Sequence, residues 1–309
     1  MQTMKNKVEL QVHSNHSDGS YSVAALFKMA KKQGVAIFSI TDHDSVVGIP
    51  KAFEAAKLFK ISYIAGVELT VVYQKSELHL LGYGIDHHNA GLRKLTEFSR
   101  KSRAEQIAKM TIKLQKLGYQ VSFAQVKSRA HGLIARPHLA DEIIANPKNR
   151  AYFKKRHGKL PNRSLFIQTY IIPGKPAFVE KKYVPIKQGI DVIHKAGGFA
   201  FLSHPLGRRF SEGIGLTSYR NWRRVLFNLK RMCLDGIEVY APDHFVSDQK
   251  TLFRFAKRNH LLMSGGSDFH NLRIPGIPLG YVSKKRKIPY SVGKNLLHQV
   301  NPKFTFRAK

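Results

Sequence analysis

The sequence predicts an α/β fold: a parallel barrel of strands and helices that a helical insertion divides into two parts. Three observations predict it. Strand-like runs alternate with amphipathic helices in the first and last thirds of the 309-residue chain. The middle of the chain loses that alternation and becomes helical and strongly basic. Most of the apolar runs also end on His, Asp or Glu, and in a parallel barrel the carboxyl ends of the strands meet on one face.

The first part of the barrel is predicted to cover residues 1–88. The runs VELQV, AIFSIT, ISYIAGVELT and ELHLLGYGI have the composition of strands. Apolar spacing predicts a helix over 23–33, with Ser22 as its N-cap and Gly34 just past its end. Pro50 suits the first turn of the next helix. This βαβ order predicts a parallel sheet with helices outside it.

The insertion is predicted to cover residues 89–182. A long amphipathic helix over 92–117 ends at Gly118, and shorter helices follow over 122–129 and 138–145. The stretch 146–175 is rich in basic and turn residues and has little periodicity.

The second part of the barrel is predicted to cover residues 183–309. Helical spacing recurs over 186–195, 219–232 and 247–258, and the runs FAFLS, GIEVY and LLMS separate these helices as strands. The final run NPKFTFRAK is predicted to be peripheral.

The charge of the chain is unusual. Lys and Arg number 52 against 20 acidic residues, a formal net charge of +32 with a pI near 10.3. Residues 90–182 carry 21 basic and 5 acidic residues, so the insertion is the expected polyanion-facing part. A solvated lysine coat without a binding role is the alternative.

The sequence has no feature of a secreted or membrane protein. It contains one cysteine, no N-terminal signal pattern and no apolar run near the roughly 20 residues that a spanning helix needs. We expect a soluble, cytoplasmic protein that contacts no membrane and has no obligate protein partner.

The side chains at the strand ends are of the types that bind metal ions. The candidates, in chain order, are His13, Asp18, Asp42, His43, Asp44, Glu68, His204, Asp268 and His270, with His79 inside a strand. So many imidazoles and carboxylates at one face suit several divalent cations better than one. A single such His would more often be a hydrogen-bonded structural residue.

The motifs VHSNHSDG, TDHD, GVEL, ARPHLADEI, GKPAF, AFLSHP, GIEVY and GGSDFH, in this order, resemble the PHP (polymerase and histidinol phosphatase) family. They are most similar to its stand-alone phosphoesterases, which include 5′→3′ exoribonucleases and 3′,5′-nucleotide bisphosphate phosphatases. The resemblance implies the PHP fold, a distorted (β/α)7 TIM-like barrel that holds up to three divalent metals.

Carried over by position, the resemblance implies three ligand sets: His13, Glu68 and Asp268; Glu68, His79 and His204; Asp18, His43 and His270. It also implies substrate-phosphate contacts from Arg136, His138 and Lys175. His244 and the pair Arg208-Arg209 are weaker candidates for that role. The sequence departs from the family at Gln11, where the first His is expected. An amide oxygen binds Mg²⁺ or Mn²⁺ but is a poorer Zn²⁺ ligand than imidazole, so the first metal is predicted to be weak, exchangeable or absent.

We expect a metal-dependent phosphoesterase that hydrolyses 5′-phosphorylated RNA or short oligonucleotides as a 5′→3′ exonuclease. A metal-bound hydroxide would attack, without a protein nucleophile. Two or three divalent cations are expected, Mn²⁺ first, with Zn²⁺, Fe²⁺ or Mg²⁺ as alternatives. A 3′,5′-nucleotide bisphosphate phosphatase is the alternative activity, and a catalytically impaired nucleic-acid-binding PHP protein is the second alternative. The leaving-group acid stays open.

Overall fold

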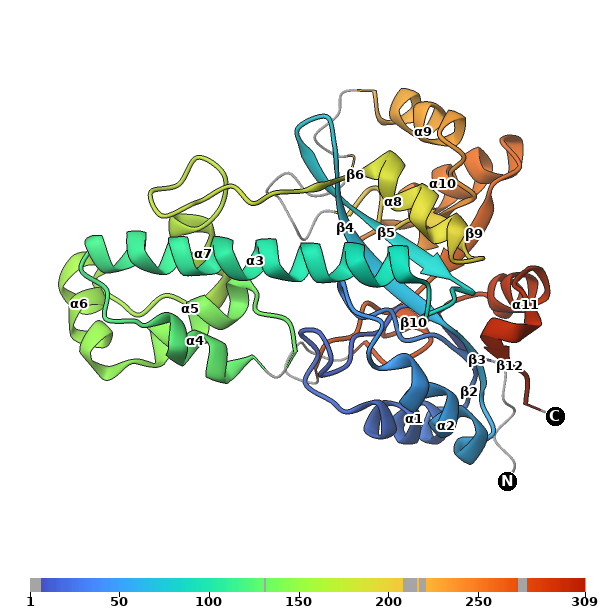
Figure 1. The fold of residues 1–309 in the computed structure, drawn as a ribbon, viewed down its shortest axis with the longest axis horizontal. Coiled ribbons are helices and arrows are strands. Elements are labelled where there is room, and N and C mark those ends of the chain that lie inside the picture. Colours follow the sequence, from blue (N-terminus) through green and yellow to red (C-terminus); the bar gives the residue numbers. More distant parts are fainter. Residues whose placement is uncertain (1–6, 131, 208–215, 217–220, 272–276, 309) are drawn as a thin grey trace. The chain divides into compact units, whose positions relative to one another are not determined.

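The computed structural model describes residues 7–130, 132–207, 216, 221–271 and 277–308. The chain divides into two compact units (Figure 1). Met1–Glu97 and Val184–Lys309 form the first, here called the α/β unit, and Phe98–Tyr183 form the second, the helical unit. Within the described residues, no helix is both long enough and apolar enough to cross a bilayer.

A four-stranded sheet opens the α/β unit. Its order is β1 (Lys7–Glu9), β2 (Val35–Phe38), β3 (Ser62–Ile64) and β12 (Thr305–Phe306). The first three strands are parallel and β12 joins β3 antiparallel. As predicted, the last residues are peripheral, since those described, 301–308, are exposed or half-buried and form an edge strand. They cover a sheet edge that would otherwise expose unpaired backbone groups, and their phenylalanines pack against the core.

The second sheet of this unit has six strands. They run in the order β6 (Val184–Pro185), β4 (Gly66–Tyr73), β5 (Ser76–Tyr83), β7 (Phe199–Leu202), β8 (Gly236–Tyr240) and β9 (Leu262–Gly265). β5 is antiparallel to both β4 and β7, so the prediction of a wholly parallel sheet is wrong. Only two residues join β4 to β5, and a parallel crossover needs a dozen or more. A further hairpin pairs β10 (Tyr281–Ser283) with β11 (Arg286–Lys287).

Six α-helices and a short 3-10 helix complete the described part of the α/β unit. They are α1 (Val23–Lys32), α2 (Ile49–Phe59), α8 (Ile186–Lys195), α9 (Trp222–Arg231), α10 (Val246–Arg258), α11 (Tyr290–Gln299) and η2 (Pro302–Phe304). The predicted start of α1 is confirmed, because the Ser22 hydroxyl accepts a hydrogen bond from Ala25 N. Gly34, with φ 74°, follows its C-cap as predicted.

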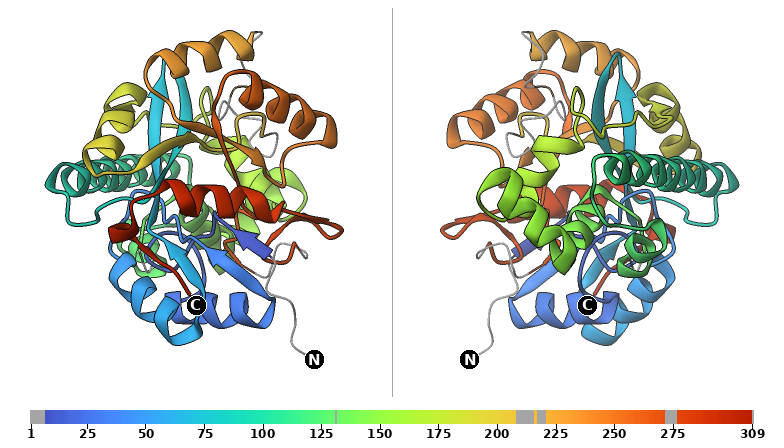
Figure 2. Two further views of the ribbon diagram at one scale, coloured as in Figure 1. Left: turned by 90° about the vertical axis from the view of Figure 1, so that its right-hand side faces the viewer. Right: turned by 90° about the vertical axis from the view of Figure 1, so that its left-hand side faces the viewer.

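The helices bury their apolar faces against the two sheets. α1 and α2 pack on the first sheet and α8 on the second, and together they enclose the larger apolar cluster. α11 lies across β1, β2 and β9 and covers a second cluster (Figure 2). This contact is close, since a Cβ at Gly293 would lie 2.1 Å from Val8 Cγ2. The strand ends that carry the candidate ligands are thereby held by a packed core.

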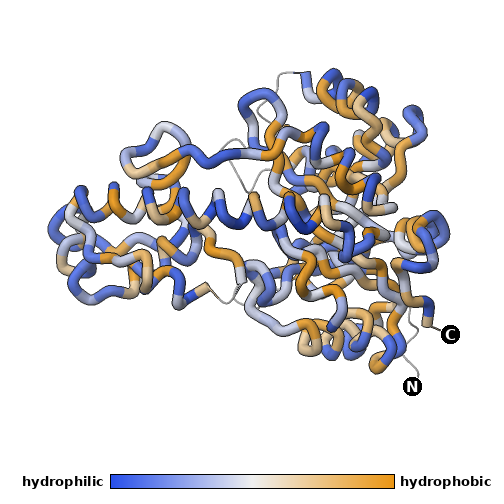
Figure 3. Tube along the Cα trace, in the orientation of Figure 1, coloured by the Kyte–Doolittle hydropathy of each residue, from blue (hydrophilic) through white to orange (hydrophobic). Residues whose placement is uncertain are grey.

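The helical unit contains five helices around its own apolar cluster. They are α3 (Ala90–Lys116, whose first eight residues belong to the α/β unit), α4 (Phe123–Arg129), α5 (Arg136–Ala145), α6 (Pro147–His157) and α7 (Arg163–Tyr170). The sequence did not predict α6 and α7. Their amino-terminal caps are Asn146 and Asn162, which accept hydrogen bonds from Lys148 N and Leu165 N. In α6 apolar residues are few, as its mostly blue tube shows (Figure 3), so periodicity could not reveal it.

Candidate metal centre

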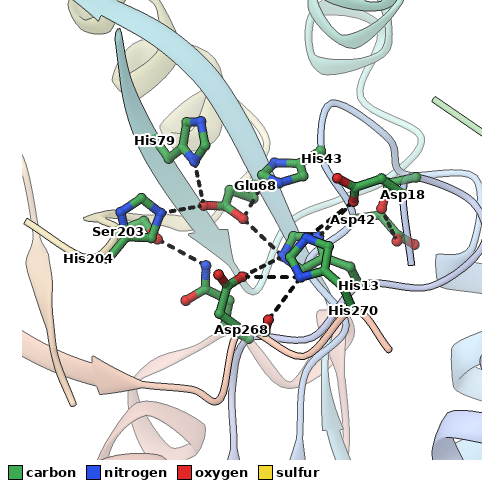
Figure 4. A network of polar contacts seen from close by, with 12 residues as sticks. His13, Asp18, Asp42, His43, Glu68, His79, Ser203, His204, Asp268 and His270 are labelled. Carbon is green, nitrogen blue, oxygen red and sulfur yellow. Dashed lines mark hydrogen bonds and ion pairs between the residues drawn. The ribbon is translucent and has the colours of Figure 1, made fainter. Parts of the chain in front are cut away.

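The structure brings the eight predicted ligands of the α/β unit together (Figure 4). Glu68 lies in β4 and His79 faces it from the adjacent β5, as Thr70 and His79 are register partners. The other six follow strands. Two isolated parallel bridges, Val12 with Phe269 and His43 with Glu68, connect the segments beyond the strand ends and hold these loops against each other.

Glu68 stands at the middle of the cluster and is completely buried. Its Oε1 lies 3.1 Å from His79 Nδ1 and 3.5 Å from His204 Nε2. Its Oε2 lies 3.1 Å from His13 Nε2 and 3.5 Å from His43 Nδ1. One carboxylate therefore meets four imidazoles, two on each oxygen, which is an arrangement suited to bridging two cations.

The remaining carboxylates also lie close to His13. Asp268 Oδ1 is 3.1 Å from His13 Nε2, and Asp18 Oδ1 is 3.9 Å from His13 Nδ1. His270 Nε2 lies 3.3 Å from Asp18 Oδ1. The His13 ring also stacks on those of His270 and His43, with centroid distances of 4.1 Å and 4.4 Å. His13 thus presents Nε2 to Glu68 and Asp268, and Nδ1 to Asp18.

Three groups have ligand atoms within 4.8 Å of one another: His13, Glu68 and Asp268; His43, Glu68 and His79; His13, Asp18, His43 and His270. The first has the members of the predicted first set, and the third adds His13 to the predicted third set. The second contains His43 where the prediction has His204. His204 belongs to none of the three, although its Nε2 is close to Glu68. Which cation each side chain would bind stays a prediction.

The donor set fits divalent cations. Four buried atoms of the cluster make no well-aligned hydrogen bond among the described residues, although other ligand-type atoms lie near them: His13 Nδ1, Asp18 Oδ1, His43 Nδ1 and Glu68 Oε2. Burying polar atoms without partners costs free energy unless something else binds them. Imidazole nitrogens and carboxylate oxygens that converge on one space would be satisfied together by divalent metals.

The electrostatics of the cluster favour the cation-binding forms of His43 and Glu68, whereas the pKa values of His13, His79 and His270 are raised and favour their protonated forms. Burial lowers the pKa of the His43 imidazole to about 3. Burial raises the pKa of the Glu68 carboxyl, but His43 and His79 outweigh it and hold that pKa well below its usual range. Burial lowers the pKa of His13, but its contacts with Asp268 and Glu68 outweigh burial and hold the pKa well above the usual range. A cation at His13 would therefore have to displace a proton.

Two sequence candidates, Asp42 and Asp44, brace the loops instead. Asp42 accepts hydrogen bonds from Ser14 N, Ser14 Oγ and Ser17 Oγ at 2.6–2.7 Å. Asp44 accepts hydrogen bonds from Thr70 N and Thr70 Oγ1, both at 2.9 Å. The carboxylates before and after His43 in the chain thus hold its loop by hydrogen bonds to neighbouring segments. The motif TDHD predicted a polar loop, but it did not predict that these two carboxylates support the loop instead of joining the cluster.

A buried network of hydrogen bonds next to the cluster was not predicted from the sequence. Gln11 Nε2 donates to Ser203 Oγ at 3.0 Å, and Ser203 Oγ donates to Glu238 Oε2 at 3.4 Å. The same Glu238 oxygen accepts the backbone N–H of His204 at 2.8 Å. Burial raises the pKa of Glu238 well above its usual range. The sequence feature that could have indicated it is Glu238, the one carboxylate in the otherwise apolar run GIEVY. Gln11 Oε1 is buried and has no hydrogen-bond partner among the described residues.

Two residues of the cluster have strained backbones. His204 has φ 26° and Asp268 has φ 51°, a region that residues other than glycine rarely adopt. Such strain persists only where surrounding contacts hold it, and it is common at functional sites. Here it turns both side chains toward Glu68 and His13.

The predicted phosphate contacts lie in the helical unit, whereas all eight predicted ligands lie in the α/β unit. Arg136 and His138 are in the first turn of α5, and His138 Nδ1 accepts a hydrogen bond from Ala135 N. Lys175 is exposed in the loop after α7. Their contact with substrate stays a prediction.

The structure does not favour the weaker phosphate candidate His244. This side chain is buried, its Nδ1 is 2.9 Å from Val239 O, and its Nε2 accepts the N–H of Leu206 at 3.2 Å. Both ring nitrogens are therefore engaged in holding the loop after His204. The other weak candidates, Arg208 and Arg209, lie outside the described residues.

The chain is similar to known proteins, whose family and names are consistent with a metal centre of this kind. The PHP domain model matches residues 9–160. A 5′-3′ exoribonuclease of Haemophilus influenzae is 29% identical over 95% of both chains. The 5′-3′ exoribonuclease Rnm of Escherichia coli is 30% identical and covers 88% of this chain and 87% of its own. A 3′,5′-nucleoside bisphosphate phosphatase of Chromobacterium violaceum is 27% identical, with coverages of 85% and 87%.

The fold is similar to that of a solved amidohydrolase structure from Chromobacterium violaceum with bound sulfate. The TM-score is 0.74 at 24% identity, over 98% of both chains. At that identity the likeness concerns the fold alone. The family model, the relatives and the buried cluster of imidazoles and carboxylates all lead to one assignment: the chain belongs to the PHP family and is a metal-dependent phosphoesterase.

Proposed function

We propose that the chain hydrolyses 5′-phosphorylated RNA or short oligonucleotides from the 5′ end, with two or three divalent cations bound around Glu68. The observation that carries the proposal is the position of Glu68, whose two oxygens each meet two imidazoles. Two relatives named as 5′-3′ exoribonucleases support the substrate class. We also propose that the two sheets are the halves of a distorted (β/α)7 barrel, with the helical unit as its insertion.

The chain's own residues would prepare the reaction as follows. Glu68 stays a carboxylate between its imidazoles, and burial keeps His43 neutral beside it. Arg136, His138 and Lys175 would hold the terminal phosphate, because a guanidinium donates two parallel hydrogen bonds to phosphate oxygens. Bound divalent cations would lower the pKa of water and neutralise the charge that develops on phosphorus. No side chain is needed as a nucleophile.

A phosphatase acting on 3′,5′-bisphosphates is the second candidate, favoured by the relative from Chromobacterium violaceum that bears this name. Both activities would use the same cluster, and they differ in what lies beyond the scissile phosphate. A polymer has many further phosphates that a basic surface can bind, whereas a small nucleotide needs only a positive pocket.

A series of 5′-phosphorylated oligoribonucleotides of increasing length, compared with adenosine 3′,5′-bisphosphate, separates the two candidates. The exonuclease proposal predicts that kcat/KM rises with length. If kcat/KM is flat or falls with length while the bisphosphate is hydrolysed well, the phosphatase is the better assignment. If metal-loaded protein hydrolyses neither substrate yet binds RNA, the chain is the impaired nucleic-acid-binding protein.

A further inference from the structure

Two neighbouring helices concentrate the positive charge of the helices in the α/β unit. α9 carries four cations and no carboxylate, and α10 carries four cations and one carboxylate, Asp248. The other four of its α-helices, α1, α2, α8 and α11, together carry eight Lys or Arg and two carboxylates. All eight cations of the pair are exposed: Arg223, Arg224, Lys230, Arg231, Lys250, Arg254, Lys257 and Arg258. We call this surface the α9/α10 face.

Exposed aromatic rings lie among these cations. Phe227 of α9 is 48% exposed and Phe253 of α10 is 37% exposed. Phe227 contacts the buried Phe255 edge to face at 5.2 Å, which joins the two helices. Lys257 Nζ lies 5.7 Å from the centre of the Phe253 ring. Both helices alternate blue and orange along their length (Figure 3), so they bury one side and expose the other.

The start of α10 is attached to the candidate metal centre. His244, which precedes the helix, accepts the N–H of Leu206, two residues after His204. The next residue, Phe245, is 61% exposed, and its N–H is bound by Asp248 Oδ2 at 2.9 Å. The single carboxylate of α10 therefore caps the helix. Residues 246, 250, 253, 254 and 257 then share one helical face that leads away from this end.

We propose that the α9/α10 face binds the single-stranded RNA that extends from the scissile phosphate. The identity of the polymer rests on the proposed function. Rows of cations for successive phosphates, interleaved with exposed rings on which bases stack, are the means by which proteins bind single strands without reading sequence. Charge complementarity favours a polyanion, and the exposed rings favour one with accessible bases over a duplex or a membrane surface.

α6 of the helical unit provides a matched control. It is as basic, with Lys148, Arg150, Lys154, Lys155 and Arg156 exposed, and it contains no carboxylate. Of its Phe and Tyr residues, Phe153 is buried and Tyr152 is half-buried, with its hydroxyl donating to Leu117 O at 2.7 Å. If charge alone mattered, α6 and the α9/α10 face would be equivalent.

The test compares two double charge reversals, Lys250→Glu/Arg254→Glu in α10 and Lys154→Glu/Lys155→Glu in α6. Each changes the net charge equally at exposed sites, and circular dichroism checks the fold. Binding is measured by fluorescence anisotropy with a labelled single-stranded RNA of about 15 nucleotides, the upper range of one binding platform. Turnover is measured on that RNA, on a 5′-phosphorylated dinucleotide and on adenosine 3′,5′-bisphosphate.

The proposal predicts that the α10 variant weakens RNA binding at least about tenfold and lowers the salt slope of log K by about 1.4, since two phosphate contacts are lost at about 0.7 each. The α6 variant should change binding less than about twofold by the same salt-dependent measure. Turnover of the two small substrates should stay the same in both variants. Phe253→Ala should weaken binding without changing the salt slope.

Equal effects of the two double variants would overturn the proposal, since generic electrostatics would then suffice. So would unchanged RNA binding by the α10 variant. These results are distinct from failure of the proposed function, which would appear as absent RNA turnover by the unaltered protein. Because binding is measured separately from turnover, the α9/α10 face is tested in either case.

Discussion

His43 and Glu68 are in contact through both their backbones and their side chains. Their backbones form an isolated parallel bridge, and His43 Nδ1 lies 3.5 Å from Glu68 Oε2. The loop that follows β2 is thereby fixed against β4 at the point where both carry candidate ligands. The same carboxylate reaches His13, His79 and His204, so a single buried side chain connects four segments that are distant in sequence.

Replacing Glu68 with Gln should reduce hydrolysis more than about 100-fold, beyond the range expected for residues that only support a ligand. The amide keeps the shape but cannot supply two anionic oxygens to cations. Steady-state kinetics and thermal unfolding of metal-free protein check this. Glu77→Gln, which removes a carboxylate 3.7 Å from His79 Nε2, is the control for a residue that only supports a ligand and should lose no more than about 100-fold in activity. Loss of folding in Glu68→Gln would indicate a structural role instead.

Replacing Asp42 with Ala should destabilise the protein by about 3 kcal/mol, because three hydrogen bonds to a buried carboxylate are lost. The loop that carries His13 and Asp18 would also lose its anchor to Ser14 and Ser17. Urea unfolding measures the stability, and metal analysis should show lower occupancy. Asp44→Ala removes the bonds to Thr70 and leaves the anchor at Ser14 and Ser17 in place, so its metal content should fall less; an equal or greater fall would contradict the anchoring role of Asp42.

Replacing Gln11 with His should raise the content of Mn²⁺ and Zn²⁺ after purification, and with it the turnover rate. An imidazole is a better ligand than an amide for borderline-soft cations. Gln249→His, another buried glutamine exchange, is the control. Mass spectrometry measures the metal content independently of activity and so shows whether the exchange improves metal binding. No gain in either quantity would show that Gln11 does not limit the first metal.

Mn²⁺ binding should tighten as the pH rises from 7 to 9 and should release protons. Burial lowers the pKa of His79, but Glu68 outweighs it and raises the pKa to about 9. Most of the folded, metal-free protein therefore carries a proton on His79 at pH 7 and about half of it does near pH 9, so a cation has fewer protons to displace as the pH rises. Calorimetry in two buffers of different ionisation enthalpy counts the protons. Affinity that is independent of pH would contradict a protonated His79.

Much of the candidate centre could be predicted from the sequence, because side chains that follow strands must gather at one edge of a sheet. That argument brought His13, His43, His204 and Asp268 together. It could not assign His43 to Glu68 and His79 rather than His204, because such pairing depends on loop backbones, including the left-handed φ of His204 and Asp268.

The sheet and the supporting polar groups were harder to predict. Alternating strands and helices predicted parallel strands, but the two-residue turn at Gln74 and Lys75 makes β5 antiparallel. The roles of Asp42, Asp44 and Glu238 depend on hydrogen-bond partners far away in sequence, such as Ser203 for Glu238. Spacing along the chain carries no information about those partners.

The most direct test of the account is anomalous scattering from crystals grown with Mn²⁺. We predict two or three peaks within the cluster, one of them bound by His13, Glu68 and Asp268, with the Glu68 carboxylate in contact with two peaks. Peaks only at the protein surface, or a fully active crystal form with none near Glu68, would contradict a metal centre built on this residue.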